Sequence, residues 1–210
     1  DEIILVSKVT KNEIGFFIIN RKQKGIEIKN NILLDSGTYS DIKFNDVIVP
    51  MENRVNIKIN GEELLKDILA IAYSGLASEM LGVIMESFDI TVNYLKERQQ
   101  FGVPIGSYQA LQHRAAKIFS EIQLCKSIVI KSLQSIDQVN KERFKYSHLA
   151  KAKLGKTIKL VTNEAIQMHG GIGVTDDADI GFYMKRARVL QQLFGDYNFH
   201  LDKLAAINKY

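Results

Sequence analysis

Arg98 is the first residue to consider for chemistry, since it stands just before a Phe-Gly-Val-Pro break in a helical pattern. A guanidinium carries forked donors that match the oxygen atoms of a phosphate group. The same cation at a helix end can also pair with Glu97 or with the negative end of the helix dipole. From the residues alone, this second interpretation is favoured.

A second candidate is the glycine run Gly170 to Gly173, which follows Gln167. Gly170 and Gly171 lack Cβ atoms, so their backbone can approach a bound nucleotide closely. Glycine runs also end helices, and this one must end the helical pattern that precedes it. Taken alone, Gly-Gly-x-Gly is a weak signal of binding.

Three carboxylates are candidates for acid–base chemistry. Asp196 could exchange protons if its surroundings tune its pKa. It also lies in a Gly-Asp-Tyr-Asn turn, where an aspartate that caps the final helix is the favoured interpretation. Glu79 and Glu86 lie seven residues apart on one face of a predicted helix, where helix–helix or subunit contacts are the commoner role.

Histidine and cysteine residues give no metal site. His113 and His148 have no companion ligands at metal-binding spacing, so no metal is expected. Cys125 is the single cysteine, which cannot form an internal disulfide, and it is interpreted as a buried core thiol. This usage fits a reducing intracellular setting, and a cytoplasmic location is expected.

The composition is that of an ordinary globular protein, with 46% hydrophobic and 25% charged residues. The formal net charge of +4 favours anionic partners only weakly, and a solvated lysine-rich face is the preferred explanation. Basic residues do not alternate with aromatic ones, so no nucleic-acid partner is expected. The apolar stretch from Asp67 to Leu81 carries polar residues and is judged too short for a membrane span, so no membrane partner is expected.

The first 50 or so residues have the two-residue period of β-strands. Short β-branched or aromatic runs are bounded there by Asn, Gly and Lys. Pro50 ends the last of these runs and removes a ladder donor. The predicted strand segments are 3–6, 15–19, 25–28, 42–44 and 46–49.

From Gly61 onward the period changes to about 3.6 residues, which predicts helices. The segment from Asn60 to Glu63 is a plausible helix entrance with acidic residues in the first turn. Phe101 to Gly106 breaks the pattern, and Ser107 is expected to cap the next helix. Helices are predicted over 61–100, from 107 through 133, and over 141–168, 180–193 and 197–207.

These elements predict an α+β fold, in which a partial β-domain is followed by an antiparallel helical bundle. The predicted domains are residues 1–55 and residues 56–210. Since the chain begins in strand-like sequence without an initiator Met, we expect it to be part of a longer gene product. The positions expected to face the bundle core are Leu111, Ala115, Ile118, Ile122, Cys125, Val129 and Leu133, then Leu149, Ala152, Ile158, Val161 and Ala165.

Three segments, in matching order and spacing, resemble the acyl-CoA dehydrogenase family. Lys96 to Gln109 resembles the family's Arg-x-x-Phe-Gly-x-Pro-Ile and the aromatic-Gln pair after it. Glu164 to Thr175 resembles its Gln-x-x-Gly-Gly-x-Gly signature, and Phe44 to Pro50 is similar to the strand that closes its β-domain. The resemblance covers essentially the whole chain, and it implies the family's middle β-domain in part and its C-terminal helical bundle.

The resemblance implies FAD as cofactor and reverses the preference for Arg98, whose guanidinium would bind the pyrophosphate. Gln109 and Gln167 could hydrogen-bond the adenosine part, and His169 would pack near the cofactor without transferring a proton. In the family these residues often reach the FAD of a neighbouring subunit, which implies an oligomer. The implied cofactor residues are Arg98, Gln100, Phe101, Gln109, Gln167, Gly170 and Gly171.

Both positions at which the family usually carries its catalytic base hold inert residues. The usual Glu aligns with Phe194, and the alternative position on the first bundle helix aligns with Ala72. The Arg that often stands beside it, used for substrate binding, is replaced by Tyr73. Asp196 is the carboxylate nearest in sequence to the usual position. The segment 185–188 occupies the place of the family's Arg-Asp and is interpreted as a polar helix face.

The leading prediction is an FAD-dependent acyl-CoA dehydrogenase of fatty acid metabolism, with Asp196 as an unusual base. Its expected partners are an acyl-CoA, an electron-transfer flavoprotein or similar acceptor, and further subunits in a homo- or hetero-oligomer (dimer or tetramer). The alternative is a base-lacking subunit that completes the FAD site of another chain, since the Leu-Phe-Gly-Asp ending resembles a branch with such members. A flavin oxidase or monooxygenase on the same fold is a third prediction that no sequence feature specifically supports.

Overall fold

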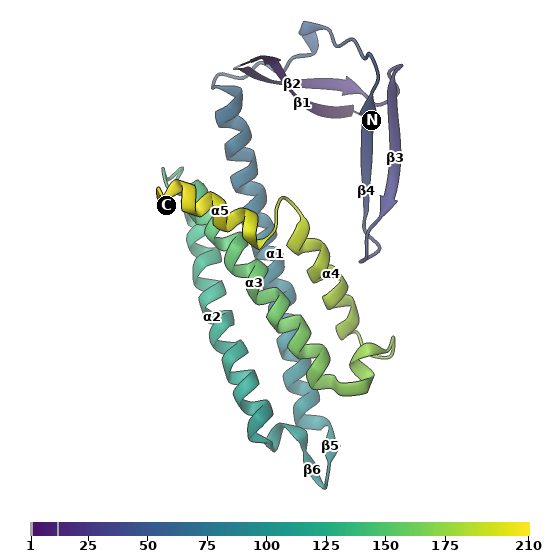
Figure 1. Ribbon diagram of the computed structural model, residues 1–210, viewed down its shortest axis with the longest axis vertical. Helices are drawn as coiled ribbons and strands as arrows, with labels where there is room; N and C mark the ends of the chain where they lie inside the picture. The colour runs from purple at the N-terminus through teal and green to yellow at the C-terminus, as the bar shows by residue number, and fades with distance from the viewer. Residues whose placement is uncertain (1, 12) are drawn as a thin grey trace. The chain divides into compact units, whose positions relative to one another are not determined.

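A computed structural model describes residues 2–11 and 13–210, and the chain divides into two compact units, residues 1–69 and 70–210 (Figure 1). The first unit holds the first four β-strands, and the second holds most of the helical bundle together with two very short strands. Helix α1 (Gly61–Glu97) begins in the first unit and ends in the second. The mixture of small antiparallel sheets and long helices agrees with the α+β prediction.

The strands form two separate antiparallel hairpins. In the first, Ile3 lies opposite Ile19 and Leu5 opposite Phe17, so alternate apolar side chains share one face. In the second, the β-branched pair Ile28 and Ile42 lies in register. Their strands are β1 (Glu2–Thr10), β2 (Glu13–Asn20), β3 (Ile26–Ile32) and β4 (Thr38–Phe44).

The strand predicted over 46–49 is wrong, because this segment pairs with no strand among the described residues. Asn45 donates its backbone N–H to Gly25 O at 2.8 Å, and Asp46 then turns the chain with a φ of 51°. A side chain holds the next residues in place, as Gln23 Nε2 donates to Ile48 O at 2.7 Å. The hydrophobic run therefore passes along the second hairpin as irregular chain.

Helix α1 begins as the sequence indicates. The backbone N–H of Glu62 donates to Asn60 Oδ1 at 2.8 Å, which satisfies one of the free donors of the first turn. Gly61 is required there because a Cβ atom would lie 2.0 Å from Ile14 O. The predicted entrance at Asn60 to Glu63 is confirmed.

The end of α1 differs from the prediction, because the helix stops at Glu97 rather than near residue 100. The next residues form a small ribbon of β5 (Gln99–Gln100) and β6 (Val103–Pro104). Phe101 and Gly102 make its turn with φ angles of 54° and 82°. Two positive φ angles in succession are typical of the tightest hairpin turns, so the ribbon interrupts the helix early.

Three of the remaining helices run lengthwise with α1 in an antiparallel bundle, and the last helix lies across them (Figure 1). Ser107 does not cap the second of them, since its hydroxyl donates to Pro104 O within a short 3₁₀ turn and Tyr108 is the N-cap. The other predicted ends agree with the structure to within a few residues. The helices are α2 (Gln109–Asp137), α3 (Arg143–His169), α4 (Ile180–Gln192) and α5 (Tyr197–Ile207), with 3₁₀ turns η1 (Met51–Asn53), η2 (Ile105–Ser107) and η3 (Gly170–Val174).

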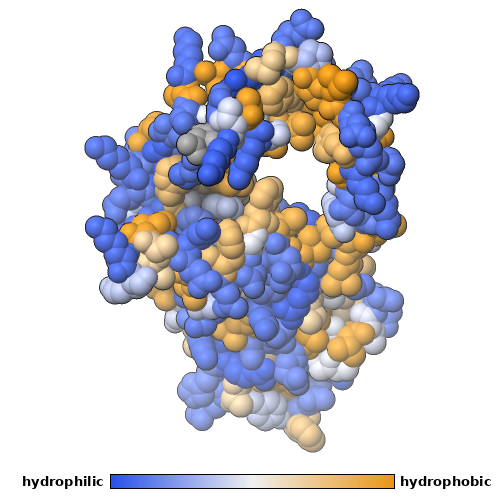
Figure 2. Space-filling view, turned by 45° about the horizontal axis from the view of Figure 1, so that its top comes forward, coloured by the Kyte–Doolittle hydropathy of each residue, from blue (hydrophilic) through white to orange (hydrophobic). Residues whose placement is uncertain are grey.

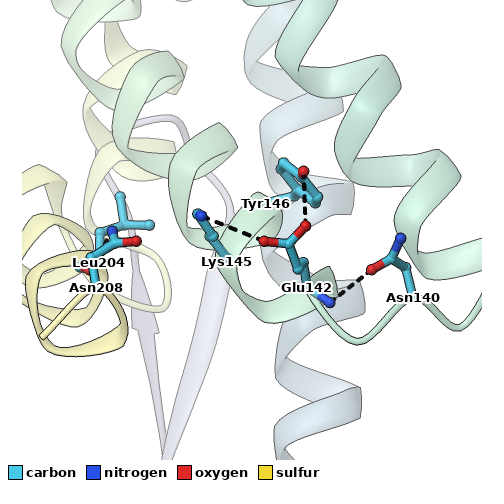
Figure 3. Close-up of polar contacts among 6 residues, drawn as sticks. All are labelled: Asn140, Glu142, Lys145, Tyr146, Leu204 and Asn208. Atoms are coloured by element: carbon cyan, nitrogen blue, oxygen red, sulfur yellow. Dashed lines mark hydrogen bonds and ion pairs between the residues drawn. The ribbon is translucent and has the colours of Figure 1, made fainter.

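Side chains fix the start of α3, as Figure 3 shows. Asn140 Oδ1 accepts the backbone N–H of Glu142 at 2.8 Å. The Glu142 carboxylate then accepts Tyr146 Oη at 3.2 Å and pairs with Lys145 at 3.5 Å. These contacts use i+3 and i+4 neighbours on one helix face, which holds the first turn together.

The bundle core is built mainly from α1, α2, α3 and α4 and includes Met80, Ile122 and Leu154, all buried. Two predicted core positions, Leu133 and Leu149, are wrong because both side chains are exposed. In α2 the core position next to Leu133 belongs to Ser132, whose Oγ lies 2.7 Å from Ser74 Oγ of α1. This buried hydroxyl pair turns Leu133 about a quarter of a turn away from the core.

Helix α1 is strongly apolar, since its most apolar 18-residue stretch has a mean hydropathy of 1.7 and is 33% buried. By length and composition alone it could cross a membrane, so the expectation of a stretch too short to span is wrong. A core helix of a water-exposed bundle passes the same test, and α1 supplies Ala77 and Ile84 to the core. Figure 2 shows a mostly hydrophilic surface interrupted by hydrophobic patches.

Candidate functional site

Helix α1 ends, α2 begins and α3 ends towards the same end of the bundle (Figure 1). A cavity of about 580 Å³ opens there. Arg98 and Gln100 enter it from the segment after α1, and Arg114 from α2. The segment 167–172 closes it from the end of α3. The lining includes two guanidinium groups and two carboxamides but no carboxylate, so it suits an anionic, hydrogen-bonding ligand.

Most of the predicted cofactor residues come together here. The cavity lining includes Arg98, Gln100, Gln167, Gly170 and Gly171. Two segments that are about 70 residues apart in sequence therefore face the same space.

The other two predicted residues, Phe101 and Gln109, do not line this cavity. Phe101 is 93% exposed at the tip of the β5–β6 ribbon, and Gln109 is an exposed first residue of α2. The expectation that these two residues lie beside the cofactor stays a prediction.

The glycines that follow α3 are present for different structural reasons. Gly170 ends the helix with a φ of 65°, a conformation that glycine adopts without strain. A Cβ atom at Gly170 or Gly171 would meet nothing within 4 Å, so their missing side chains leave open backbone at the cavity. At Gly173 a Cβ atom would lie 2.7 Å from Ile166 O, so that glycine is required for packing.

One wall of the cavity is a stacked pair of aromatic rings. The sequence predicted one member of the pair, His169, but not the other, Tyr94. The rings of Tyr94 and His169 stack at 4.4 Å between centroids, and Tyr94 Oη donates to His169 O at 3.2 Å. His169 Nδ1 lies 2.7 Å from Ala165 O, which can only accept, so Nδ1 carries a proton and donates it there. This pair also borders a second cavity of about 400 Å³.

The turn between α4 and α5 contains Phe194, the position at which the resemblance leads us to expect the catalytic base. Phe194 stands there with a φ of 56° and 54% of its surface exposed. Gly195 follows with a φ of 104°, and a Cβ atom on it would lie 2.3 Å from the Phe199 ring. Asp196 Oδ1 accepts the backbone N–H of Phe199 at 2.9 Å, so the capping interpretation of Asp196 is confirmed.

A buried lysine holds this turn from beneath. Lys151 of α3 is 1% exposed, and its Nζ donates to Leu190 O at 2.9 Å and to Gly195 O at 3.0 Å, with Gln191 O at 3.4 Å. Burial lowers the pKa of Lys151 to about 8, which the nearby Asp196 partly opposes. The ammonium thus binds the free carbonyls at the end of α4 together with the turn.

Two histidines pack beside the same turn. His148 Nδ1 and His200 Nδ1 lie 2.8 Å apart, so one ring must donate and the other must accept. The Tyr73 ring lies 5.0 Å from that of His148 and 4.8 Å from that of His200. Burial lowers the pKa of both imidazoles to about 4, and each ring is therefore neutral near pH 7. Tyr73 fills the position of the family's Arg with an aromatic contact.

Acid should destabilise the fold through this pair. Both folded pKa values lie near 4, below the ordinary 6.5, so between these values the unfolded chain binds protons that the folded chain does not. Stability should fall as the pH drops from 6.5 towards 4, by at most about 1.4 kcal/mol per pH unit for each ring. Urea unfolding of the wild type and His148→Gln across this range measures the slope, which should be smaller in the variant.

The matched control for this slope is His113→Gln, because His113 is exposed. It should retain the wild-type slope. Equal slopes in all three proteins would show that the buried pair does not titrate as described.

The remaining candidate residues have structural partners. Glu79 accepts a bidentate contact from Arg186, and Arg188 donates to Asn163 Oδ1 at 2.6 Å. The interpretation of residues 185–188 as a plain polar face is therefore incomplete. Cys125 is buried, as expected, and burial raises the pKa of its thiol. Within residues 2–11 and 13–210, His, Cys, Asp and Glu form no group of three able to hold a metal ion.

Residues 61–207 match the C-terminal domain of the acyl-CoA dehydrogenase family. Acyl-CoA dehydrogenase IpdE2 of Mycolicibacterium smegmatis is 37% identical over 131 residues, which cover 62% of this chain and 40% of that protein. The butyryl-CoA dehydrogenase structure from Megasphaera elsdenii has a TM-score of 0.90 at 24% identity and covers 100% of this chain and 56% of that one. The ChsE4–ChsE5 complex from Mycobacterium tuberculosis has a TM-score of 0.86 at 18% identity, with coverage of 100% and 56%.

The two structural likenesses show the same fold over the whole described chain. The sequence relatives set a limit as well, since this chain spans 40% of the length of IpdE2. More than half of that relative lies outside the part that this chain matches.

Proposed function

Because the chain belongs to the acyl-CoA dehydrogenase family, we propose that the protein containing it is an FAD-dependent acyl-CoA dehydrogenase. The reaction would remove hydrogen from Cα and Cβ of an acyl-CoA thioester. Bound FAD supplies the acceptor for the β-hydride. The family membership supports an oxidoreductase, and the cofactor and the substrate class are the steps proposed here.

The observation that carries the proposal is the convergence of Arg98 and the Gln167–Gly171 segment on one cavity. Arg98 presents a forked cation suited to a pyrophosphate, and no other side chain of the described residues pairs with its guanidinium. Gly170 and Gly171 leave open backbone where an adenosine or phosphate group can approach. Gln100 and Gln167 add amides that can both donate and accept.

The test uses the intact protein rather than this segment. Purified protein should be yellow, and addition of an acyl-CoA without oxygen should bleach the flavin absorbance. Protein that neither carries flavin nor regains it on incubation with FAD would exclude the proposal.

A second function is favoured by the turn at Phe194. The usual base position holds a phenylalanine, and the neighbouring Asp196 uses its carboxylate as a helix cap. We propose as the alternative that this chain completes the FAD site of a related subunit that carries the base. The likeness to a structure of two different chains, ChsE4–ChsE5, supports such an assembly in outline. Co-purification with a related chain bearing Glu at this position would support it.

Asp196→Asn separates the capping role of Asp196 from a catalytic one. Asparagine caps a helix about as well as aspartate does, so the Tm of the protein should hardly change. If the base lies on a partner chain, turnover of the assembled enzyme should also be unchanged. A loss of about 100-fold or more in kcat at unchanged Tm would instead make Asp196 the base.

The proposed partners follow from the same reaction. An electron-transfer flavoprotein or similar acceptor would reoxidise the flavin, and a dimer or tetramer would bring the cavity of one chain to the FAD of another. We also propose a cytoplasmic location, supported by the single buried Cys125. Cell fractionation tests the location, and light scattering of the pure protein tests the assembly.

A further inference from the structure

A second guanidinium shares the cavity with Arg98. Arg114 lies in the second turn of α2 and reaches the cavity from a different side of the bundle than the end of α1. Its side chain is partly buried, with 37% of its surface exposed. Since the lining contains no Asp or Glu, the two cations make this the positive region of the cavity.

The position of Arg114 is fixed by a carboxylate outside the cavity lining. Its Nε donates to Glu164 Oε2 of α3 in a close ion pair. Glu164 stands three residues before Gln167, so this bond ties α2 to the segment that closes the cavity. The bond engages Nε, and no other side chain or carbonyl among the described residues accepts from the terminal nitrogens of Arg114.

This arrangement differs from an ordinary surface ion pair. A surface pair gains little because two flexible side chains must be ordered for a screened attraction. Here Glu164 already holds Arg114 Nε without a ligand, and the terminal nitrogens remain as donors. A preordered donor raises affinity because less side-chain freedom is lost on binding.

We propose that Arg114, held by Glu164, is a second phosphate-binding residue of this cavity and contacts the diphosphate of the bound dinucleotide together with Arg98. The inference rests on the proposed FAD function and adds a residue to it. Arg98, which has no side-chain partner among the described residues, and Arg114, which is held by Glu164, would then contact the diphosphate from two different helices. The tyrosine and glutamine side chains of the lining are left for the uncharged adenosine part.

The experiment compares ADP with adenosine, because the two ligands differ only in the diphosphate. Intact protein stripped of flavin is titrated with each ligand by calorimetry, in the wild type and in Arg114→Gln. Arg114→Gln should weaken ADP binding about 10- to 100-fold, which corresponds to one lost charge-assisted contact. It should leave adenosine binding within about twofold, and ADP binding should become less sensitive to salt, since fewer charged contacts remain to be screened.

Two further variants separate binding from a purely structural role. Arg114→Lys keeps the charge without the fork and should bind ADP with intermediate affinity. Arg188→Gln is the matched control, because Arg188 lies outside the cavity and donates to Asn163 and Gln191. It should bind both ligands as the wild type does.

Each of the remaining outcomes would overturn the proposed role of Arg114. Equal ADP affinity in wild type and Arg114→Gln overturns the role of Arg114 while FAD binding itself stands. A parallel loss of ADP and adenosine affinity with a lowered Tm shows that Arg114 only holds α2 to α3. Wild-type protein that binds neither ADP nor FAD overturns this inference and the proposed function together.

Discussion

Replacement of Arg98 by glutamine is expected to weaken FAD binding by the intact protein about 10- to 100-fold. The guanidinium of Arg98 faces the cavity, and no carboxylate of the lining neutralises it. Glutamine keeps a hydrogen-bond donor on a shorter side chain but removes the charge and the fork. Flavin release during dilution, followed by the return of FAD fluorescence, measures the dissociation constant directly.

The matched control for Arg98 is Lys96→Gln, which removes one positive charge from the same helix end. Lys96 is exposed and does not line the cavity. If Lys96→Gln weakens FAD binding as much as Arg98→Gln does, general electrostatic attraction rather than a specific contact explains the loss.

Replacement of Lys151 by methionine is expected to destabilise the fold by about 2 kcal/mol at pH 9. The substitution leaves Leu190 O and Gly195 O without the amine that donates to them inside the protein. Methionine fills a similar volume, so the loss reports the hydrogen bonds rather than a cavity. Guanidinium unfolding measures the difference, and amide exchange at residues 193–199 should be faster in the variant.

The loss at Lys151 should depend on pH with a definite sign. Its folded pKa of about 8 is below the usual 10.5, so between these values the folded chain holds fewer protons than the unfolded chain. Wild-type stability therefore gains from this group as the pH rises from 8 to 10.5, and the variant lacks that gain. The difference should be larger at pH 9.5 than at pH 7. Lys159→Met, an exposed position on the same helix, should show no such trend.

The motif-bearing part of the site was predictable from sequence because it lies where helices end. Arg98 follows a helix that glycine and proline must interrupt, and Gly170 with Gly171 follows another. Helix ends carry strong local signals, so their residues can be placed without the tertiary structure. Which ends meet at one cavity was implied by the resemblance, and the structure brings them together.

The residues that could not be identified from the sequence lie within helices. There the hydrophobic pattern carries no signal for the chemical role of a polar side chain. Lys151 was overlooked because a lysine in a helical pattern is taken for a solvent-facing residue. A signal was present, since Lys151 stands four residues after the buried Ser147 and three before the buried Leu154. A charged residue on the apolar stripe of a helix indicates a buried partner. Arg114 and Tyr94 offered no comparable signal.

Two wrong predictions have local causes that only the fold supplies. The segment 46–49 has the composition of a strand, but its neighbour Gly25 and the side chain of Gln23 hold it in irregular form. Ser107 has the right residue type for a cap, but the preceding Pro104 starts a 3₁₀ turn that uses its hydroxyl. In both places a competing hydrogen bond decides between conformations that composition leaves equal.

The Phe101 turn has a consequence for any surface that covers it. A large ring is kept in water there, on a backbone conformation that asparagine or glycine would adopt with less strain. In the isolated chain the Phe101 ring stays in contact with water. Burial of this ring under a covering surface would stabilise the association by about 1.5–3 kcal/mol per chain. The exposed ring at this tip would therefore favour binding of a neighbouring apolar surface, although it adds nothing to the stability of the isolated chain.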